Sequence, residues 1–238
     1  MTTITAPSAG ISRDRWFFTG MTAAMALTAF AGFAPSFYLR SASHAGPPLT
    51  ALVIFHGMLM TAWMLANVLQ TSLIASANRQ LHRTLGWLFA ALAALIVVTG
   101  PEVGIAAIRR GAVPPGLTAE QFLVLPMAGA LMFAIFIGAG VVWRNNAQAH
   151  KRLMLLATIS VMDAAIARMP GMLELGPLAF FALADAFIIF GIAYDILSRG
   201  RVHGVWIWGG LAILVSQVLR LVISATVAWA SFVHFIVG

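Results

Sequence analysis

The chain has 238 residues, of which 61% are hydrophobic and 9% are charged, and its formal net charge is +7. A mean hydropathy of +0.94 excludes a water-soluble globular protein, because so few polar residues could not cover its surface. The chain contains no cysteine, which excludes disulfides, thiolate metal ligands and a cysteine nucleophile. The composition predicts an all-α, polytopic helical bundle in a membrane, built from spans of about 20 apolar residues.

Seven apolar runs follow one another, and each predicts a transmembrane helix. They comprise residues 16–39, 49–76, 84–108, 121–143, 152–172, 177–197 and 205–225. Residues 229–237 either prolong the seventh span or lie at the membrane interface. The first run is about twice as long as a typical signal-peptide core, so we expect it to be retained.

The whole chain, residues 1–238, reads as one integral membrane domain. Residues 1–15 form an inner tail and 16–48 the first span with its loop. Residues 49–172 form a four-helix core, and 173–238 contain the last two spans and a C-terminal interfacial segment.

Basic residues divide unevenly between the two sides of this topology. Nine fall on the side of the N-terminus, namely Arg13, Arg15, Arg79, Arg83, Arg144, Lys151, Arg152, Arg199 and Arg201, and three on the other, namely Arg40, Arg109 and Arg110. The positive-inside rule therefore predicts an inner N-terminus and, after seven spans, an outer C-terminus. The positive net charge indicates contact with anionic membrane lipids, and nothing in the chain indicates nucleic acid as a partner.

A sequence repeat divides the predicted core into two helical hairpins. The segment Asn-Arg-Gln-Leu-His-Arg-Thr-Leu begins at Asn78, and Asn-Ala-Gln-Ala-His-Lys-Arg-Leu begins at Asn146. Asn, Gln, His, a basic residue and Leu recur in register, each time between two apolar runs. We therefore predict a duplicated hairpin, formed by spans 2 and 3 and by spans 4 and 5, with one histidine per copy.

These two histidines, His82 and His150, begin spans 3 and 5 at the inner surface. In a four-helix bundle with short loops these spans lie diagonally across the core, so the imidazoles face each other. Two facing imidazoles can hold a haem iron from both sides, with Arg83, Lys151 and Arg152 beside them to bind the propionates. The alternative is that both histidines are interfacial anchors of their helices.

A second group of ionisable residues lies inside the spans. At 1.5 Å of rise per residue, His56, Glu102, Arg168, Asp185 and Arg220 share the outer half of the membrane. An ionised side chain at the centre of a span costs about 2.5–3.5 kcal/mol, so these groups should face one another or a wet cavity. We predict that Asp185 contacts Arg220 or Arg168, either as a structural ion pair or as part of a ligand or proton site. The predicted buried polar network consists of Asn67, Gln70, Glu102, Asp163, Arg168, Asp185, Gln217 and Arg220.

Span 2 has a polar stripe that runs from the outer side almost to the inner surface. It contains His56, Met60, Trp63, Asn67 and Gln70, spaced by four, three, four and three residues, which places them on one helix face. A stripe that ends in Asn and Gln is unsuited to face lipid.

The motifs Leu81-His82-Arg83-Thr84-Leu85-Gly86-Trp87 and Ala149-His150-Lys151-Arg152-Leu153-Met154 resemble a group of bacterial multi-pass membrane proteins of unknown function. The resemblance covers roughly residues 49–172 and implies a bacterial inner (cytoplasmic) membrane. More distantly, the core resembles the two-haem b-type cytochromes that exchange electrons with ascorbate or quinol. That resemblance implies haem b, His56, His82 and His150 as ligands, and a quinone or a redox protein as partner. Span 4 departs from the cytochrome pattern, because it has Val124 where a second outer histidine would lie.

Two functions remain open from the sequence. One is a redox protein with a b-type haem between His82 and His150. The other is a non-catalytic membrane protein, namely a small-molecule or proton-coupled transporter or an assembly subunit, with a structural charge network. The sequence does not decide whether the protein is an enzyme.

Overall fold

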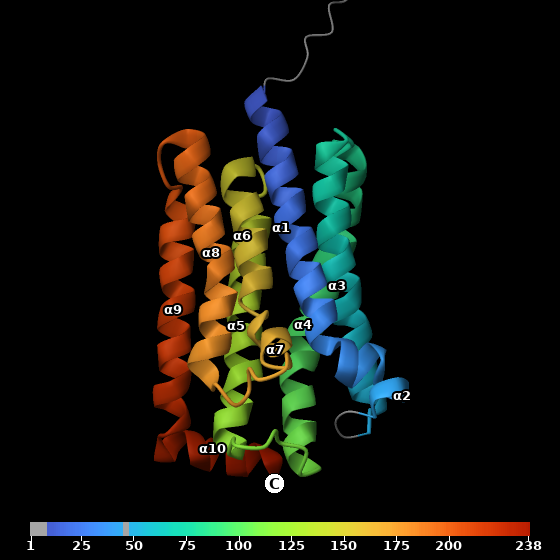
Figure 1. Ribbon diagram of the computed structural model, residues 1–238, viewed down its shortest axis with the longest axis vertical. Helices are drawn as coiled ribbons and strands as arrows, with labels where there is room; N and C mark the ends of the chain where they lie inside the picture. The colour runs from blue at the N-terminus through green and yellow to red at the C-terminus, as the bar shows by residue number, and fades with distance from the viewer. Residues whose placement is uncertain (1–8, 45–47) are drawn as a thin grey trace, which may run out of the picture.

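The computed structural model describes residues 9–44 and 48–238, and within them every regular element is helical (Figure 1). The long helices are α1 (Ala9–Phe33), α3 (Ala51–Ala75), α4 (Arg79–Arg109), α5 (Ala119–Val142), α8 (Pro177–Arg199) and α9 (Gly204–Ser224). The short ones are the π-helix η1 (Ala34–Tyr38), α2 (Arg40–Ser43), α6 (Ala147–Ile159), α7 (Asp163–Ile166) and α10 (Val227–Val237). In the described part of the chain, six helical stretches are long and apolar enough to cross a membrane. The chain is therefore a multi-pass membrane protein. We call the end where α1 begins the inner end, following the prediction from the basic residues.

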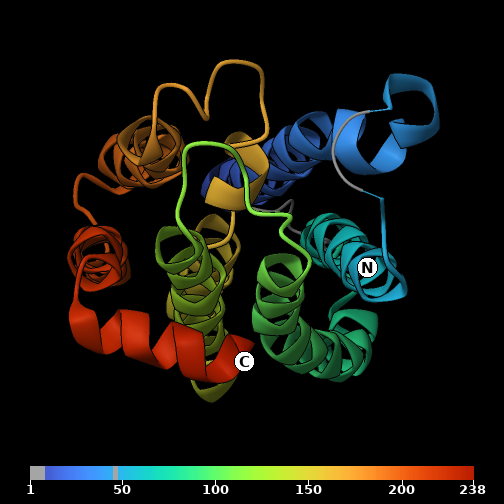
Figure 2. The ribbon, with the colours of Figure 1, turned by 90° about the horizontal axis from the view of Figure 1, so that it is seen from below.

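The helices pack around one shared core. Seen from below, α3 and α4 lie on one side of α5, and α8 and α9 lie on the other (Figure 2). Helix α1 packs against α3, α6 and α7, so the predicted core of four helices includes a fifth. This close approach depends on Gly32, where an added Cβ atom would meet the Ala165 carbonyl oxygen at 2.0 Å. At the centre, the buried Trp63 ring meets Phe133 edge to face and donates a hydrogen bond to Thr158.

The segment predicted as span 5, residues 152–172, is interrupted. Helix α6 ends at Ile159 after 13 residues, about 20 Å, which is less than the apolar thickness of a membrane. A turn separates it from α7, which has four residues. At this turn the Ser160 hydroxyl donates to the Ala157 carbonyl, and the Asp163 carboxylate accepts from the Ala164 amide. These local bonds compete with the helical ones, and they explain why a continuous apolar run does not form one helix.

The C-terminal segment is a separate helix. Helix α10 crosses beneath α4 and α5 at the outer end (Figure 1), so residues 229–237 do not prolong α9. Arg109 donates hydrogen bonds to the carbonyl groups of Ile236 and Val237, and the Trp229 indole donates to the Glu120 carbonyl. Three contacts thus hold α10 across the bundle.

The repeated asparagines have a structural role at the inner end. Asn78 caps α4 by accepting a hydrogen bond from the Leu81 amide, and Asn146 caps α6 by accepting from the amides of Gln148 and Ala149. Each cap places a histidine four residues later, in the first helical turn. Beyond this start the two halves differ, since α4 has 31 residues and α6 has 13. The duplication therefore stays a prediction.

Candidate haem site and membrane charge clusters

His82 and His150 lie together at the inner end. Their ring centroids are 6.2 Å apart, and the ring planes make an angle of 88°. The residues are 68 positions apart in the sequence. Their helices, α4 and α6, are each capped by an asparagine and begin at the same end of the bundle. The structure thus brings together the two histidines that the repeat singled out.

Several polar atoms around this pair have no hydrogen-bond partner in the described chain. His150 Nδ1 lies 2.8 Å from the Gly140 carbonyl oxygen; because a carbonyl only accepts, Nδ1 donates and Nε2 keeps its lone pair. The His82 ring makes no hydrogen bond in the described chain, and its Nδ1 is buried. Gln70 donates through Nε2 to the His82 carbonyl, while its Oε1 is buried without a hydrogen-bond partner in the part of the chain that the structure describes. A buried unpaired polar atom costs about 1–3 kcal/mol, so a ligand that contacted these atoms would be stabilised.

The separation of the ring centroids is close to the separation that two imidazoles would have if a nitrogen of each bound one metal ion. Two metal–nitrogen bonds of about 2 Å, plus roughly 1 Å from each nitrogen to its ring centre, give about 6 Å between centroids. Among the described residues no group of three or more His, Cys, Asp or Glu side chains could hold a metal ion. A protein site with two nitrogen ligands suits haem, because the porphyrin would supply the remaining ligands of the iron. The residues present therefore fit a haem better than a bare ion such as zinc.

Of the basic residues predicted to bind propionates, two have other partners. Lys151 Nζ lies 2.5 Å from Asp14 Oδ2 and 4.3 Å from the centre of the Phe18 ring. Arg152 is completely buried and paired with Asp195. Arg83 is exposed and makes no ion pair in the described chain, so it is the one cation of the three that stays available. The predicted role of Lys151 and Arg152 as propionate ligands stays a prediction, and both side chains already have a carboxylate partner.

The Arg152 guanidinium anchors the start of α6. It donates to both carboxylate oxygens of Asp195 on α8, and to the carbonyl and side-chain oxygens of Gln148. Asp195 also accepts from the His203 amide at 3.0 Å, which connects α6 to the start of α9. Because Arg152 is two residues after His150, this network also fixes the place of His150. Asp14 and Asp195 were absent from the predicted site. The sequence signal that could have identified them is that they are acidic residues at a predominantly basic inner surface.

In the outer half, a second cluster joins α7, α8 and α9. Arg220 pairs with Asp163, and Gln217 donates to Asp185 at 2.9 Å. The prediction that Asp185 contacts Arg220 or Arg168 is therefore wrong. The physical reason is the break after α6, which turns the Asp163 carboxylate toward α9 and gives Arg220 a nearer partner.

The remaining predicted polar residues do not join either cluster. His56 binds Thr99 at 2.8 Å and lies 14 residues from Gln70 on α3, about 21 Å along the helix from the histidine pair. Arg168 stacks over the Phe33 ring and donates to the Ala164 carbonyl. Asn67 donates to a carbonyl of its own helix. Glu102 is exposed and has no partner in the described chain.

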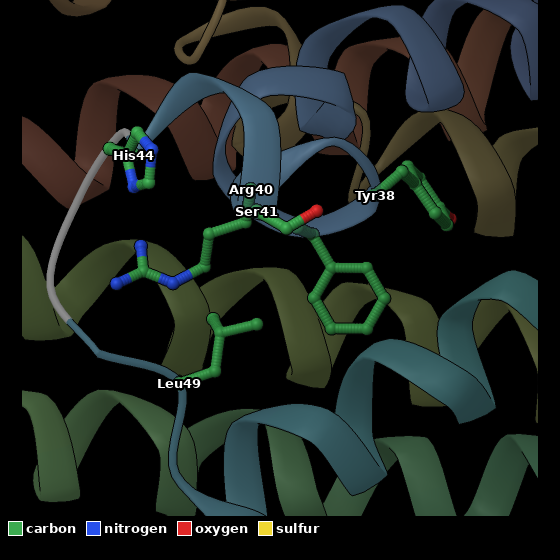
Figure 3. A pocket seen from close by; sticks show the side chains of 6 residues that line it. Tyr38, Arg40, Ser41, His44 and Leu49 are labelled. Carbon is green, nitrogen blue, oxygen red and sulfur yellow. The ribbon is translucent and has the colours of Figure 1, made fainter.

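A cavity of about 500 Å³ lies at the opposite, outer end (Figure 3). Its lining consists of Phe37, Tyr38, Arg40, Ser41, His44 and Leu49. Residues 45–47, between His44 and Leu49, lie outside the described chain. This cavity includes none of the predicted site residues.

Comparisons with family models, with curated proteins and with solved structures found no match. The resemblances to bacterial membrane proteins and to b-type cytochromes therefore stay predictions, and the functional argument depends on the geometry of the site.

Proposed function

We propose that the protein is a membrane redox protein in which His82 and His150 hold a b-type haem at the inner end of the bundle. The observation that carries this proposal is the separation of 6.2 Å between their ring centroids, which is close to the separation that two imidazoles would have if both bound one haem iron. Haem, when bound, supplies one-electron chemistry. The electron partner in this proposal is a quinone, a quinol or a redox protein of the same membrane.

The chain's own residues would orient and tune the two ligands. The hydrogen bond from His150 Nδ1 to the Gly140 carbonyl fixes the ring and its tautomer, as such bonds do for the other ring nitrogen of metal-ligating histidines. Gln70 Oε1 is an acceptor beside His82 that has no other partner. Arg83, which forms no ion pair in the described chain, would bind a propionate, and the Arg152–Asp195 pair holds the start of α6 in place.

A transporter is the second candidate, and the outer cluster favours it. An interrupted helix at membrane depth is a feature of transporter binding sites, and ionisable residues inside spans mark proton and ion pathways. Here the break after α6 lies next to Asp163, which pairs with Arg220. In this alternative the inner histidines act as interfacial anchors.

Single histidine replacements test the redox proposal. The protein is expressed with haem supply, solubilised and purified, and its visible spectrum is measured oxidised and reduced. His82→Ala and His150→Ala should each abolish the low-spin haem spectrum, because the chain has no cysteine and the neighbouring residues are cationic. The matched controls His44→Ala and His203→Ala should keep it. A wild-type spectrum without a Soret band, or an unchanged spectrum in both site variants, would overturn the proposal.

A further inference from the structure

Asp185 has an unusual environment for a carboxyl group inside a membrane helix. It lies eight residues from the outer start of α8 and 14 from its inner end, about 12 Å and 21 Å along the helix. It is only partly buried. Its one hydrogen bond in the described chain comes from Gln217, which carries no charge.

The charged groups around Asp185 already have other partners. Helices α6, α7 and α9 pack against α8. On α7 the ionisable residue is Asp163, and on α9 it is Arg220, and these two form an ion pair. Arg168, just after α7, is stacked on Phe33 of α1, and the charged residues of α6 lie at the inner end. An ionised Asp185 would therefore be a third charge beside a neutral pair.

Such a charge is costly at this depth. Ionised side chains inside a span cost several kcal/mol unless a partner compensates them. A neutral amide donor compensates a carboxylate far less than a guanidinium does. The protonated carboxylic acid removes the charge, and it keeps the hydrogen bond from Gln217 on Oδ1 while Oδ2 carries the proton.

The structure also offers a partner for the ionised form. Arg220 binds Asp163 through Nη1, but its Nε is buried and has no hydrogen-bond partner among the described residues. Gln217 and Arg220 are three residues apart on α9, so they lie on the same helix face, and Gln217 on that face contacts Asp185. When Asp185 loses its proton, the Nε–H group of Arg220 can donate to the new carboxylate. The two forms of Asp185 thus each have a hydrogen-bond donor.

We propose that Asp185 is a proton-binding site within the membrane. Asp185 alternates between two forms as it binds and releases a proton: a neutral acid held by Gln217 and a carboxylate held by Arg220. The ligand is the proton itself, taken up as the carboxylate becomes a carboxylic acid. The shorter path to water leads to the outer side. This site is independent of the haem proposal and serves either candidate function.

Labelling with a hydrophobic carbodiimide tests the site. The reagent enters membranes and reacts with protonated carboxyl groups to give a stable N-acylurea, which peptide mass mapping locates. The full-length protein in lipid vesicles should be labelled at Asp185, with labelling that falls as the pH rises. Asp163 should stay unlabelled because its carboxylate is paired with Arg220.

Two isosteric variants complete this experiment. Asp185→Asn keeps a hydrogen-bonding group of the same size, and it should lose both the adduct and an infrared band of a protonated carboxyl group. Asp163→Asn is the matched control and should keep the adduct at Asp185. Absence of labelling at Asp185 at every pH, labelling there that ignores pH, or preferential labelling of Asp163 would each overturn the proposal. None of these outcomes depends on the haem spectrum, so the proton-site proposal and the haem proposal are tested independently.

Discussion

Loss of the ion pair between Arg152 and Asp195 should destabilise the protein more than loss of any surface pair. Both side chains are completely buried, and the guanidinium donates to both carboxylate oxygens. Asp195→Ala leaves that guanidinium in the core without a carboxylate partner in the described chain, with hydrogen bonds to Gln148 and with the Phe18 ring beside it. Removing one member of a buried pair costs about 3–5 kcal/mol, whereas replacing both by apolar groups costs far less. Asp195→Ala should therefore be less stable than Arg152→Met/Asp195→Ala.

The assay is a double-mutant cycle, with free energies of unfolding measured in detergent for the wild type, both single variants and the double variant. We expect a coupling free energy of about 1–3 kcal/mol. Lys151→Met is the control from the adjacent pair with Asp14, whose side chains are 21% and 23% exposed, and it should cost about 1 kcal/mol. Additive losses in the cycle, or equal losses for Asp195→Ala and Lys151→Met, would refute the reasoning.

Three further predictions address the outer cluster, the helix packing and the topology. At a pH low enough to keep Asp185 protonated, Asp163→Ala and Arg220→Ala should be strongly coupled in thermal unfolding, whereas Asp185→Ala and Arg220→Ala should be nearly additive; the reverse order would contradict the observed pairing. Gly191→Ala should cost about 1–3 kcal/mol, because the new methyl group would lie 2.2 Å from a buried tryptophan ring of α9; Gly20→Ala should not destabilise, because no described atom beyond its own stretch of helix lies within 4 Å of the new methyl group. A phosphatase fused to the C-terminus should be active and a fluorescent protein there dark, and the opposite pair of results would reverse the orientation.

The class of the fold and the histidine pair could be predicted from the sequence, for separate reasons. Long apolar runs have few alternatives to membrane helices. His82 and His150 could be paired because the repeat placed them in register, four residues after asparagines that the structure shows to be N-caps. Their contact followed from the topology, without knowledge of any side-chain packing.

Partners that depend on local breaks or distant chain segments could not be predicted. Asp14 and Lys151 are 137 positions apart, and no periodicity connects α1 to the start of α6. The break after α6 comes from side-chain bonds of Ser160 and Asp163 within an apolar run, which hydropathy does not detect. That break redirected Asp163 to Arg220 and left Asp185 with a neutral amide, so one local departure from helix changed the pairing of the whole outer cluster.

The central claim is that His82 and His150 together bind one haem, and electron paramagnetic resonance tests it most directly. The protein would be purified from membranes after expression with haem supply, its haem content measured, and the spectrum of the oxidised form recorded. The geometry predicts one haem per chain with a low-spin ferric signal, as expected for two imidazole ligands. A protein that contains no haem, or one with a purely high-spin signal, would contradict the claim and leave the histidines as interfacial anchors.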